Sequence, residues 1–562
     1  MASNNNNNLS EVEKIKAASN YLRGTLIESL NEEITGALAP EDTNILKFHG
    51  SYQQTDRDLS SERKKQKLEP LYSFMIRARL TAGIISSSQW LTINELADKY
   101  GNGTMKLTTR QTFQLHGILK RNLKKNIQEI NQILITTLAT CGDVNRNVMS
   151  SPNPYLSRLH FETFLDAIRI SNHLLPKTKA YYEIWLDKEK VAGNGTNEEP
   201  IYGPTYLPRK FKIAIAVPPY NDTDVFSNDI GLIAIAENNR LVGYNVLAGG
   251  GMGMSFEDPA THPRLGDILG YVPKDKMLKV VEEILKIQRD RGNRSDRKFA
   301  RLKYTIENMG LDAFKKELTE RSGIELEPPR PFEFVSNNDR FGWTQGDDKL
   351  WHYCLFVETG RIKDAENYPL KSSLKLIAEK FQPTFIITGN QNIIIANVAE
   401  EAKNEIDSIL QGILSRKPLT GLRQHSLACT ALNQCPLAFA EAERYLPSLI
   451  DKIDQILFEL HLENEPINIR MTGCPNGCAR PYLGEIGLVG RTIGKYNLYL
   501  GANAQGTRLN VLYREMADEE TILNILKDIL QQFATKRLEH ERLGDFIVRT
   551  KLVQVPYVVQ NI

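Results

Sequence analysis

Alternation of apolar and polar residues predicts several strands in the first half of the chain. Arg77 and Arg79 alternate with apolar neighbours, so a strand puts both on one face. Residues 206–217 alternate most clearly, and there Lys210 and Lys212 share a face. Two lysines so placed repel each other unless solvent or an anion separates them. The pattern therefore fits either a solvated edge strand or a face that binds an anion.

Residues 106–117 predict a further strand with an unusual polar face. That face carries four side chains: Lys106, Arg110, Gln114 and His116. A solvated sheet face would explain them. However, an exposed face rarely combines two cations, an amide and an imidazole without acidic partners. Arg146 follows in a loop after the next predicted helix. The pattern favours a binding face, with a second cation nearby.

Two further patterns complete the first half. Residues 230–253 predict a hairpin that ends in a glycine-rich loop, and the spacing of the glycines does not match the dinucleotide-binding GxGxxG pattern. Such a loop allows close approach of a large flat cofactor. Apolar residues at helical spacing predict an amphipathic helix over about 275–291, with Gly292 ending it.

The second half of the chain repeats the order of these patterns. The matching segments are 77–84 with 355–362, 96–100 with 377–381, 108–115 with 388–395, and 230–249 with 486–501. Each match is weak, but the common order predicts a duplication of the form A-B-A′-B′. The copies differ, because A carries Arg110 where A′ carries Asn390, and B′ carries cysteines where B carries Lys210 and Lys212. A site at the junction would combine cations from one half with thiols from the other.

Composition narrows the class of protein. The 562 residues predict several domain-sized units, and 41% hydrophobic content supports their cores. Lys and Arg (70) nearly balance Asp and Glu (68), so no overall charge favours nucleic acid. No apolar run approaches the length of a membrane span, and the first residues are polar. We therefore expect a cytoplasmic protein in a reducing compartment.

Four of the six cysteines form two pairs. Cys429 and Cys435 have five residues between them, and Cys474 and Cys478 flank Pro-Asn-Gly, which predicts a tight turn. The other two, Cys141 and Cys354, are isolated. In a chain without a secretory signal, this spacing predicts metal or cluster ligation and not disulfides. An iron–sulfur cluster is favoured over zinc, whose staples usually use C-x2-C pairs, and over unrelated buried cysteines.

The two cysteine pairs, with Pro436 after the first and Arg480 after the second, resemble the signature of the sirohaem-dependent sulfite and nitrite reductases. In that family the four thiolates hold a 4Fe–4S cluster, and the last, here Cys478, also bridges to the sirohaem iron. The resemblance covers nearly the whole chain and implies an α+β fold with two ferredoxin-like repeat units and two larger mixed α/β cofactor-binding units. The expected boundaries are 1–65 for an N-terminal arm, 66–145 and 331–420 for the ferredoxin-like units, and 146–330 and 421–562 for the larger units.

The resemblance also implies roles for individual residues. The substrate anion would face Arg77, Arg146, Lys210 and Lys212. The sirohaem carboxylates and their surroundings would be addressed by Arg110, Gln114, His116, Arg209, Lys303 and Asn476. One departure is Thr81-Ala-Gly83, where related sequences tend to have Pro-Gly-Gly. It changes the residues of the turn that follows Arg77 but does not affect the charge of Arg77.

The implied activity is six-electron reduction of sulfite to sulfide, in sulfate assimilation and cysteine biosynthesis. Because the chain shows no nucleotide-binding loop, NADPH oxidation would belong to a flavoprotein (alpha) partner. The arm resembles that of haemoprotein subunits of NADPH-dependent sulfite reductases, where it meets this partner. Two alternatives stay open: nitrite reduction with the same cofactors, and a zinc-stapled binding protein without catalytic activity.

Overall fold

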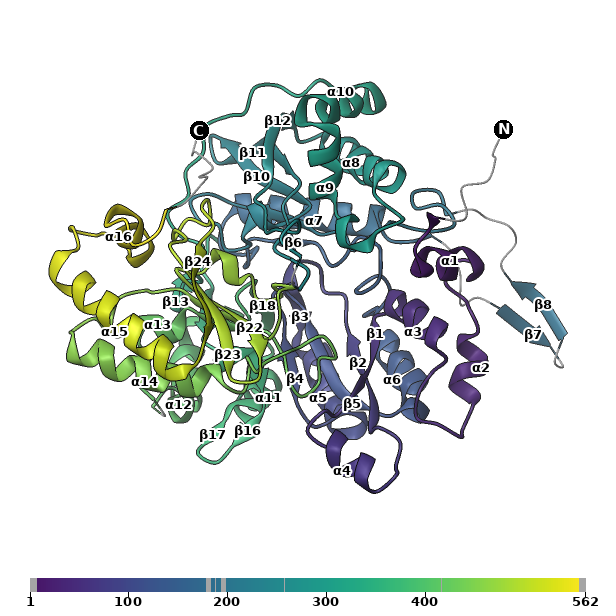
Figure 1. Cartoon of the computed structure of the whole chain (residues 1–562), viewed down its shortest axis with the longest axis horizontal. Helices are drawn as coiled ribbons and strands as arrows, with labels where there is room; N and C mark the ends of the chain where they lie inside the picture. The colour runs from purple at the N-terminus through teal and green to yellow at the C-terminus, as the bar shows by residue number, and fades with distance from the viewer. Residues whose placement is uncertain are drawn as a thin grey trace.

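The computed structural model describes residues 8–177, 183–186, 189–193, 199–256, 258–415 and 417–554. Figure 1 shows an α+β molecule in which sheets of both halves meet near the centre and helices cover their outer faces. None of the described helices is long and apolar enough to cross a membrane. The fold expected from the duplication is confirmed by two pairs of matching five-stranded sheets.

The first ferredoxin-like sheet has the order β1-β2-β5-β4-β15. Its strands are β1 (Ser51–Thr55), β2 (Tyr72–Arg77), β5 (Phe113–Ile118), β4 (Met105–Leu107) and β15 (Arg361–Ile362). Helices α5 (Ser87–Tyr100) and α6 (Lys120–Gln132) bury an apolar face against it. A capping box between Ser86 and Gln89 starts α5.

The second ferredoxin-like sheet has the order β13-β14-β19-β18-β3. Its strands are β13 (Gly342–Gln345), β14 (Trp351–Leu355), β19 (Ile393–Val398), β18 (Thr384–Ile387) and β3 (Ile84–Ser86). Helices α11 (Leu370–Phe381) and α12 (Lys403–Leu414) accompany it, as does the small pair β16 (Asp364–Ala365) and β17 (Tyr368–Pro369). The two repeats exchange edge strands, because β15 pairs with β4 and β3 pairs with β18.

The two larger units share one strand pattern, in which the first three strands run parallel and the last two pairings are antiparallel. Unit B contains β6 (Met149–Ser150), β9 (Ile213–Ala216), β10 (Ile230–Glu237), β11 (Arg240–Ala248) and β12 (Asp267–Pro273). Unit B′ contains β20 (Ser426–Ala428), β21 (Ile469–Thr472), β22 (Ile486–Thr492), β23 (Lys495–Leu500) and β24 (Val511–Ala517). Ile230 pairs with Ile213 as Ile486 pairs with Ile469, so the registers also correspond.

Helices cover both larger units. Unit B has α7 (Arg158–His173), α8 (Met277–Arg291), α9 (Leu302–Met309), α10 (Leu311–Ser322) and the pair β7 (Glu183–Leu186) and β8 (Glu189–Gly193). Unit B′ has α13 (Gly421–Gln424), α14 (Leu446–Glu459), α15 (Glu519–Lys536) and α16 (Leu543–Arg549). A shared apolar cluster, including Phe226, Ile233, Leu247, Tyr482 and Val489, joins the two units. The molecule therefore has a buried junction between its halves.

The N-terminal segment is integral to the first unit and is more than a surface arm. It forms α1 (Glu11–Ala18), α2 (Leu26–Asn31), α3 (Pro40–Leu46), β1 and α4 (Ser60–Lys65). Leu22, Ile45 and Phe48 are buried in the main core. Lys16 is 1% exposed and pairs with Glu13 at 2.5 Å, while Asp143 lies 3.5 Å away. The boundary expected at residue 65 therefore cuts through a sheet.

Three strand predictions were wrong in detail. Residues 106–117 form two strands, because Thr108 N–H donates to Thr112 O and Gln111 has a φ of 51° in the turn between them. Residues 206–217 form a strand only over β9. Tyr206 has a φ of 55°, and residues 207–212 are irregular apart from a bridge between Phe211 and Asn145. The strand β2 ends at Arg77, so Arg77 and Arg79 bind different partners. The hairpin β10–β11 and helix α8 agree with their predictions.

Candidate functional site

Both cysteine pairs follow neighbouring parallel strands. Cys429 comes directly after β20, and Cys474 follows β21 with Gly473 between them. Because β20 and β21 are parallel, their carboxyl ends meet at one edge of the sheet. Gly473 N–H donates to the Cys429 sulfur at 3.3 Å, and Phe439 N–H donates to Gly473 O at 2.8 Å. The topology thus brings the two cysteine loops together.

All four thiols are free and influence one another. Burial first, and the neighbouring sulfurs second, raise the pKa of Cys429 well above its usual range and that of Cys474 to about 12. The pKa of Cys435 is raised by the same causes. Among the described residues, no three histidine, cysteine or acidic side chains lie close enough to ligate a single metal ion. The spacings of the two pairs, C-x5-C and C-x3-C, differ from the C-x2-C pairs usual for zinc and suit an iron–sulfur cluster.

A cavity opens directly beside Cys478, at the junction of units B and B′. It is lined by Thr109, Arg110, Met149, Lys210, Lys212, Thr223, Ser227, Asn228, Met252, Gly253, Arg301, Asn476, Gly477, Cys478 and Arg480. Five of the predicted site residues thus meet here: Arg110, Lys210, Lys212, Asn476 and Cys478. Their segments come from the β4–β5 turn, the residues before β9 and the turn after β21.

Lys210 and Lys212 face this cavity without an anionic partner. The part of the chain that the structure describes places no carboxylate in an ion pair with either ammonium group, although Asp229 accepts from the backbone N–H of Lys212 at 2.9 Å. Burial, followed by the charge of Arg209, lowers the pKa of Lys210 to about 7. Burial and the charge of Lys210 lower the pKa of Lys212 well below its usual range. These shifts indicate a strongly electropositive environment. A bound anion would stabilise the charged form of both lysines there.

Arg110 adds a third uncompensated charge. Its guanidinium donates to Asn228 Oδ1 at 2.5 Å, Asn147 O at 2.5 Å and Ile213 O at 2.9 Å, all neutral acceptors. Its buried Nε has no partner. Burial, with the charge of Arg480, lowers its pKa to about 9. A buried donor without an acceptor beside a cavity is a position that an anionic cofactor group can satisfy.

Arg77 and Arg146 form a second cationic group outside the cavity lining, and Arg146 lies near enough for its charge to lower the pKa values of Lys210 and Arg110. Both donate to Thr140 O, at 3.4 Å and 3.1 Å, which holds the two guanidinium groups together. Gln114, with its amide oxygen turned toward Arg77, accepts from Nε at 3.1 Å. The Tyr52 hydroxyl bonds to Arg146 from strand β1. Tyr52 was missed in the sequence because no local pattern links β1 to the loop after α6.

Three other predicted residues lie outside the cavity lining. His116 is buried, bonds to Gln54 Oε1 at 3.2 Å, and has its pKa held well below its usual range by burial, so it is neutral. Lys303 donates to Gly251 O at 3.3 Å and Gly253 O at 2.9 Å, which fixes the glycine-rich loop. Arg209 is half-buried and lies near the charge of Asp143. These residues support the walls of the site.

Arg480 lines the cavity, although the sequence had assigned it no role of its own. It donates through Nε to Asp224 at 2.5 Å and through its other nitrogens to Thr109 O at 3.1 Å and Gly389 O at 2.9 Å. Arg470 also donates to Asp224 at 2.5 Å. Arg480 therefore connects the cysteine turn to the three other units.

Asp224 and Arg480 occupy corresponding positions in the two halves. Each has left-handed backbone, with φ of 46° and 53°, and each precedes a short 3-10 helix that leads to β10 or β22. The two copies of one ancestral position thus became a buried ion pair across the pseudo-two-fold axis.

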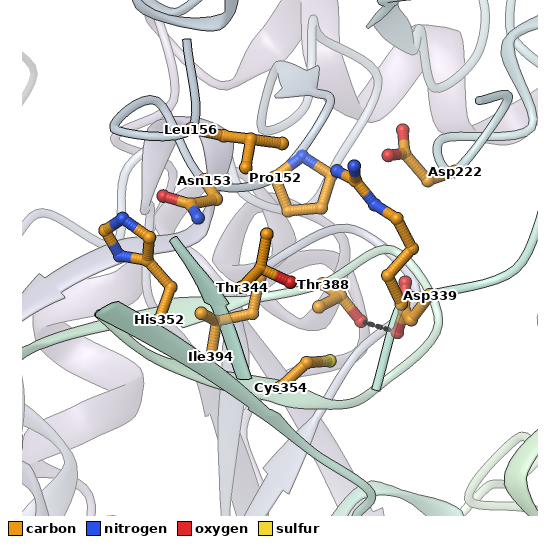
Figure 2. A pocket seen from close by; sticks show the side chains of 11 residues that line it. Pro152, Asn153, Leu156, Asp222, Asp339, Thr344, His352, Cys354, Thr388 and Ile394 are labelled. Atoms are coloured by element: carbon orange, nitrogen blue, oxygen red, sulfur yellow. Dashed lines mark hydrogen bonds between the residues drawn. The ribbon is translucent and has the colours of Figure 1, made fainter. Parts of the chain in front are cut away.

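A second cavity, shown in Figure 2, lies beside the loops of unit B that correspond in sequence order to the cysteine loops of unit B′. Ser151 follows β6 as Cys429 follows β20, and Asp222 precedes Asp224 by the interval at which Cys478 precedes Arg480. Ser151 donates to Asp222 at 2.6 Å where the thiols face one another in unit B′. Asp339 and Cys354 line the same cavity. Only unit B′ therefore carries the thiol set.

Comparisons with known proteins agree with this architecture. A profile of the nitrite and sulphite reductase 4Fe-4S domain matches residues 167–326, and a profile of the nitrite/sulfite reductase ferredoxin-like half domain matches residues 66–133 and 343–413. The structure of the Mycobacterium tuberculosis NirA protein has a TM-score of 0.79 and 21% identity, covering 97% of each chain, and shows the shared fold.

Curated relatives match over nearly the whole length. The sulfite reductase (NADPH) hemoprotein beta-component of Staphylococcus saprophyticus is 56% identical over 549 residues, which are 97% of this chain and 96% of the relative. The Anoxybacillus flavithermus protein of the same name is 55% identical over 548 residues, again 97% and 96% of the two chains. With the duplicated fold and the paired cysteine loops, these matches place the chain in the nitrite and sulfite reductase family.

Proposed function

We propose that this chain is the haemoprotein component of an assimilatory sulfite reductase, which reduces sulfite to sulfide with six electrons that come from NADPH through a flavoprotein partner. The observation that carries the proposal is the junction of the halves. There, four thiols that follow β20 and β21 adjoin a cavity whose lining includes Lys210, Lys212 and Arg110, for which the described residues provide no ion pair. The curated relatives bear the matching name at 53–56% identity.

The residues present fit both cofactors of the family. Cys429, Cys435, Cys474 and Cys478 would hold a 4Fe–4S cluster, and Cys478, which also lines the cavity, would help to hold the sirohaem there. Arg110, with its unpartnered Nε, would bind a sirohaem carboxylate. Lys303 and Asn476 would shape the surrounding wall. When bound, these groups supply the electron storage and sulfur ligation that no side chain provides.

The chain's own contribution is to bind the substrate and supply protons. Sulfite is a dianion, and Lys210, Lys212, Arg77 and Arg146 would attract it and offset the loss of its hydration. The lowered pKa values of the two lysines make them readier proton donors toward departing oxygens than a solvated lysine is. The arginines keep their charge and hold the anion in place.

Nitrite reduction is the second candidate, because nitrite is also a small anion and the same cations would bind it. The names of the curated relatives favour sulfite. A zinc-stapled protein is disfavoured by the sequence spacing of the cysteines, because zinc staples usually use C-x2-C pairs. An absorption spectrum of the purified protein, followed by sulfite and nitrite assays with reduced methyl viologen, distinguishes the three. A colourless protein that contains zinc would refute the proposal.

The cluster assignment has its own test. Serine replacements of Cys429, Cys435 and Cys474 should each abolish iron and acid-labile sulfide, because a cluster with an open corner is labile. Cys141 provides the matched control, since it is buried away from the cysteine loops and contacts Arg77 at 3.3 Å. Full cluster occupancy in the Cys435→Ser protein would contradict the four-thiol assignment.

A further inference from the structure

The segment that carries Lys210 and Lys212 into the cavity has buried backbone without the hydrogen bonds of a sheet. Residues 206–210 belong to no strand, and the first three of them are buried. A buried carbonyl group without a partner costs free energy, so a segment of this kind needs donors from elsewhere in the chain. The position of the two lysines therefore depends on contacts outside their own segment.

Three cations supply these donors, one for each of three successive carbonyl groups. The pairs are Arg294 with Tyr206 O at 2.7 Å, Lys16 with Leu207 O at 2.7 Å, and Arg297 with Pro208 O at 3.3 Å. Hydrogen bonds from charged donors are about twice as strong as those between neutral groups. Lys16, Arg294 and Arg297 are here called the carbonyl clamp. Helix α1 contributes Lys16, and the connection between α8 and α9 contributes the two arginines.

Two buried carboxylates hold the carbonyl clamp together. Glu13 accepts from Lys16 at 2.5 Å and from Arg294 at 2.6 Å. Asp143 accepts from Arg297 at 2.8 Å and lies 3.5 Å from the Lys16 ammonium group. Burial opposes the ionisation of Asp143, but the charges of Lys16 and Arg297 lower its pKa below the usual range. Lys16, which is 1% exposed, is therefore the one cation of the clamp that contacts both carboxylates.

The same network extends to the loop that carries Arg146. The backbone N–H of Leu207 donates to Asp143 O at 3.0 Å, and that of Phe211 donates to Val144 O at 3.1 Å. The backbone N–H of Arg146 in turn donates to Phe211 O at 2.9 Å. Residues 143–146 and the lysine segment are thus bonded side by side. A displacement of one segment would displace the other.

We propose that Lys16 is a positioning residue for the substrate anion, because through the carbonyl clamp it sets where Lys210 and Lys212 stand in the cavity. Lys16 is not among the residues that line the cavity, so it acts only through the backbone that it holds. The inference rests on the proposed function and extends it by assigning helix α1 to the binding of sulfite. A purely structural role would lower stability without changing how the folded protein handles the anion.

The kinetic test compares Lys16→Met with Arg508→Met. Arg508 is the matched control in unit B′, since it is 9% exposed, donates to Gly501 O at 2.8 Å and pairs with Asp545 at 2.6 Å. Both proteins, with sirohaem and cluster content confirmed by absorbance, are assayed for kcat and KM with sulfite and reduced methyl viologen. We expect kcat/KM to fall ~100-fold in Lys16→Met, because a displacement of about 1 Å far from the chemistry can cost that much. Arg508→Met should keep the kcat/KM of the unmodified protein.

Hydrogen–deuterium exchange followed by mass spectrometry tests the positioning without any enzyme assay. Lys16→Met should speed exchange in residues 206–212 and 143–146, because their shared hydrogen bonds would open more often. Lys16→Arg keeps a charged donor and should restore both slow exchange and sulfite kinetics. If Lys16→Met does not fold, Arg294→Met takes its place, since that side chain is 21% exposed and its loss leaves Lys16 with both carboxylates.

Two results would overturn the proposal. One is unchanged exchange and unchanged sulfite kinetics in the folded clamp variant. The other is a loss of kcat/KM in Arg508→Met as large as that in the clamp variant, which would mean that any lost buried cation has this effect. If the unmodified protein reduced no sulfite with dye, the proposed function would fail by itself. The exchange experiment would then still support or refute the control of the lysine segment by Lys16.

Discussion

Replacing Asp224 with asparagine tests how much the junction between the halves depends on one buried charge. The Asp224 carboxylate is 1% exposed and accepts hydrogen bonds from Arg470 and Arg480, both at 2.5 Å, and from Asn337 at 2.9 Å. Asparagine keeps the shape of the side chain but removes the charge. The two guanidinium groups, 1% and 7% exposed, would then face each other without a counterion.

The expected loss follows from this geometry. Removing one member of a buried ion pair costs about 3–5 kcal/mol, because the remaining charge stays desolvated. Here one carboxylate serves two arginines, so we expect a cost of roughly 5 kcal/mol. For a unit of 150–250 residues, each kcal/mol lowers Tm by about 2–4 °C. The melting temperature should therefore fall by roughly 10–20 °C.

Melting followed by circular dichroism at pH 7 measures the effect, with Glu405→Gln as the control. Glu405 pairs with Lys380 at the surface, where both side chains are 49% exposed, so its loss should cost about 1 kcal/mol or less. Arg480→Met should give an intermediate shift, because Asp224 keeps Arg470. If Asp224→Asn and Glu405→Gln melted within about 2 °C of each other, the buried pair would not hold the junction.

Three further predictions concern the site and its support. Lys210→Met and Lys212→Met should each lower dye-driven sulfite turnover by roughly 100- to 1,000-fold with a normal cofactor spectrum, since one lysine charge attracts each unit charge of the anion by roughly 4 kcal/mol at ~4 Å and an effective dielectric near 20, before solvation losses; near-normal turnover in both would contradict the anion site. Arg110→Gln should reduce sirohaem content, measured by its absorbance relative to protein, more than cluster iron. Burial alone would raise the pKa of Glu443, but the charges of Lys106 and Arg361 outweigh it and lower this pKa from the usual 4.5 to about 2. These ion pairs therefore stabilise the folded protein fully above pH ~4.5, and the stabilisation is lost as the pH falls toward 2. Glu443→Gln should therefore flatten that acid limb in urea unfolding measured from pH 6 to pH 3.

The sequence predicted the elements whose own apolar residues are buried and missed the features fixed by contacts distant along the chain. The hairpin β10–β11 was visible as a largely apolar segment that is buried on both faces for most of its length, and helix α8 was visible because its apolar stripe matches its buried side. The alternation over 206–217 was misleading, because Lys210 and Lys212 reach one cavity from irregular backbone.

Residues with distant partners left no local signal. The partner of Arg480 lies in the other half, and Tyr52 reaches Arg146 across the first sheet. The cysteine pairs were the exception, since two short spacings revealed ligands on neighbouring strands. No pattern in the sequence indicated that β1 belongs to the first sheet. Removing the first 60 residues would therefore disrupt that sheet, so the truncation would not test partner binding alone.

The exchange of β3 and β15 has a consequence for synthesis on the ribosome. Strand β4 reaches its final neighbour only when residues 361 and 362 have left the exit tunnel, long after the rest of its sheet has been made. At about 5–20 residues per second, this delay lasts on the order of tens of seconds. During that time β4 is an open edge that invites pairing with other chains. We expect nascent chains stopped before residue 360 to depend on chaperones and to aggregate, whereas chains released after both halves are complete should not.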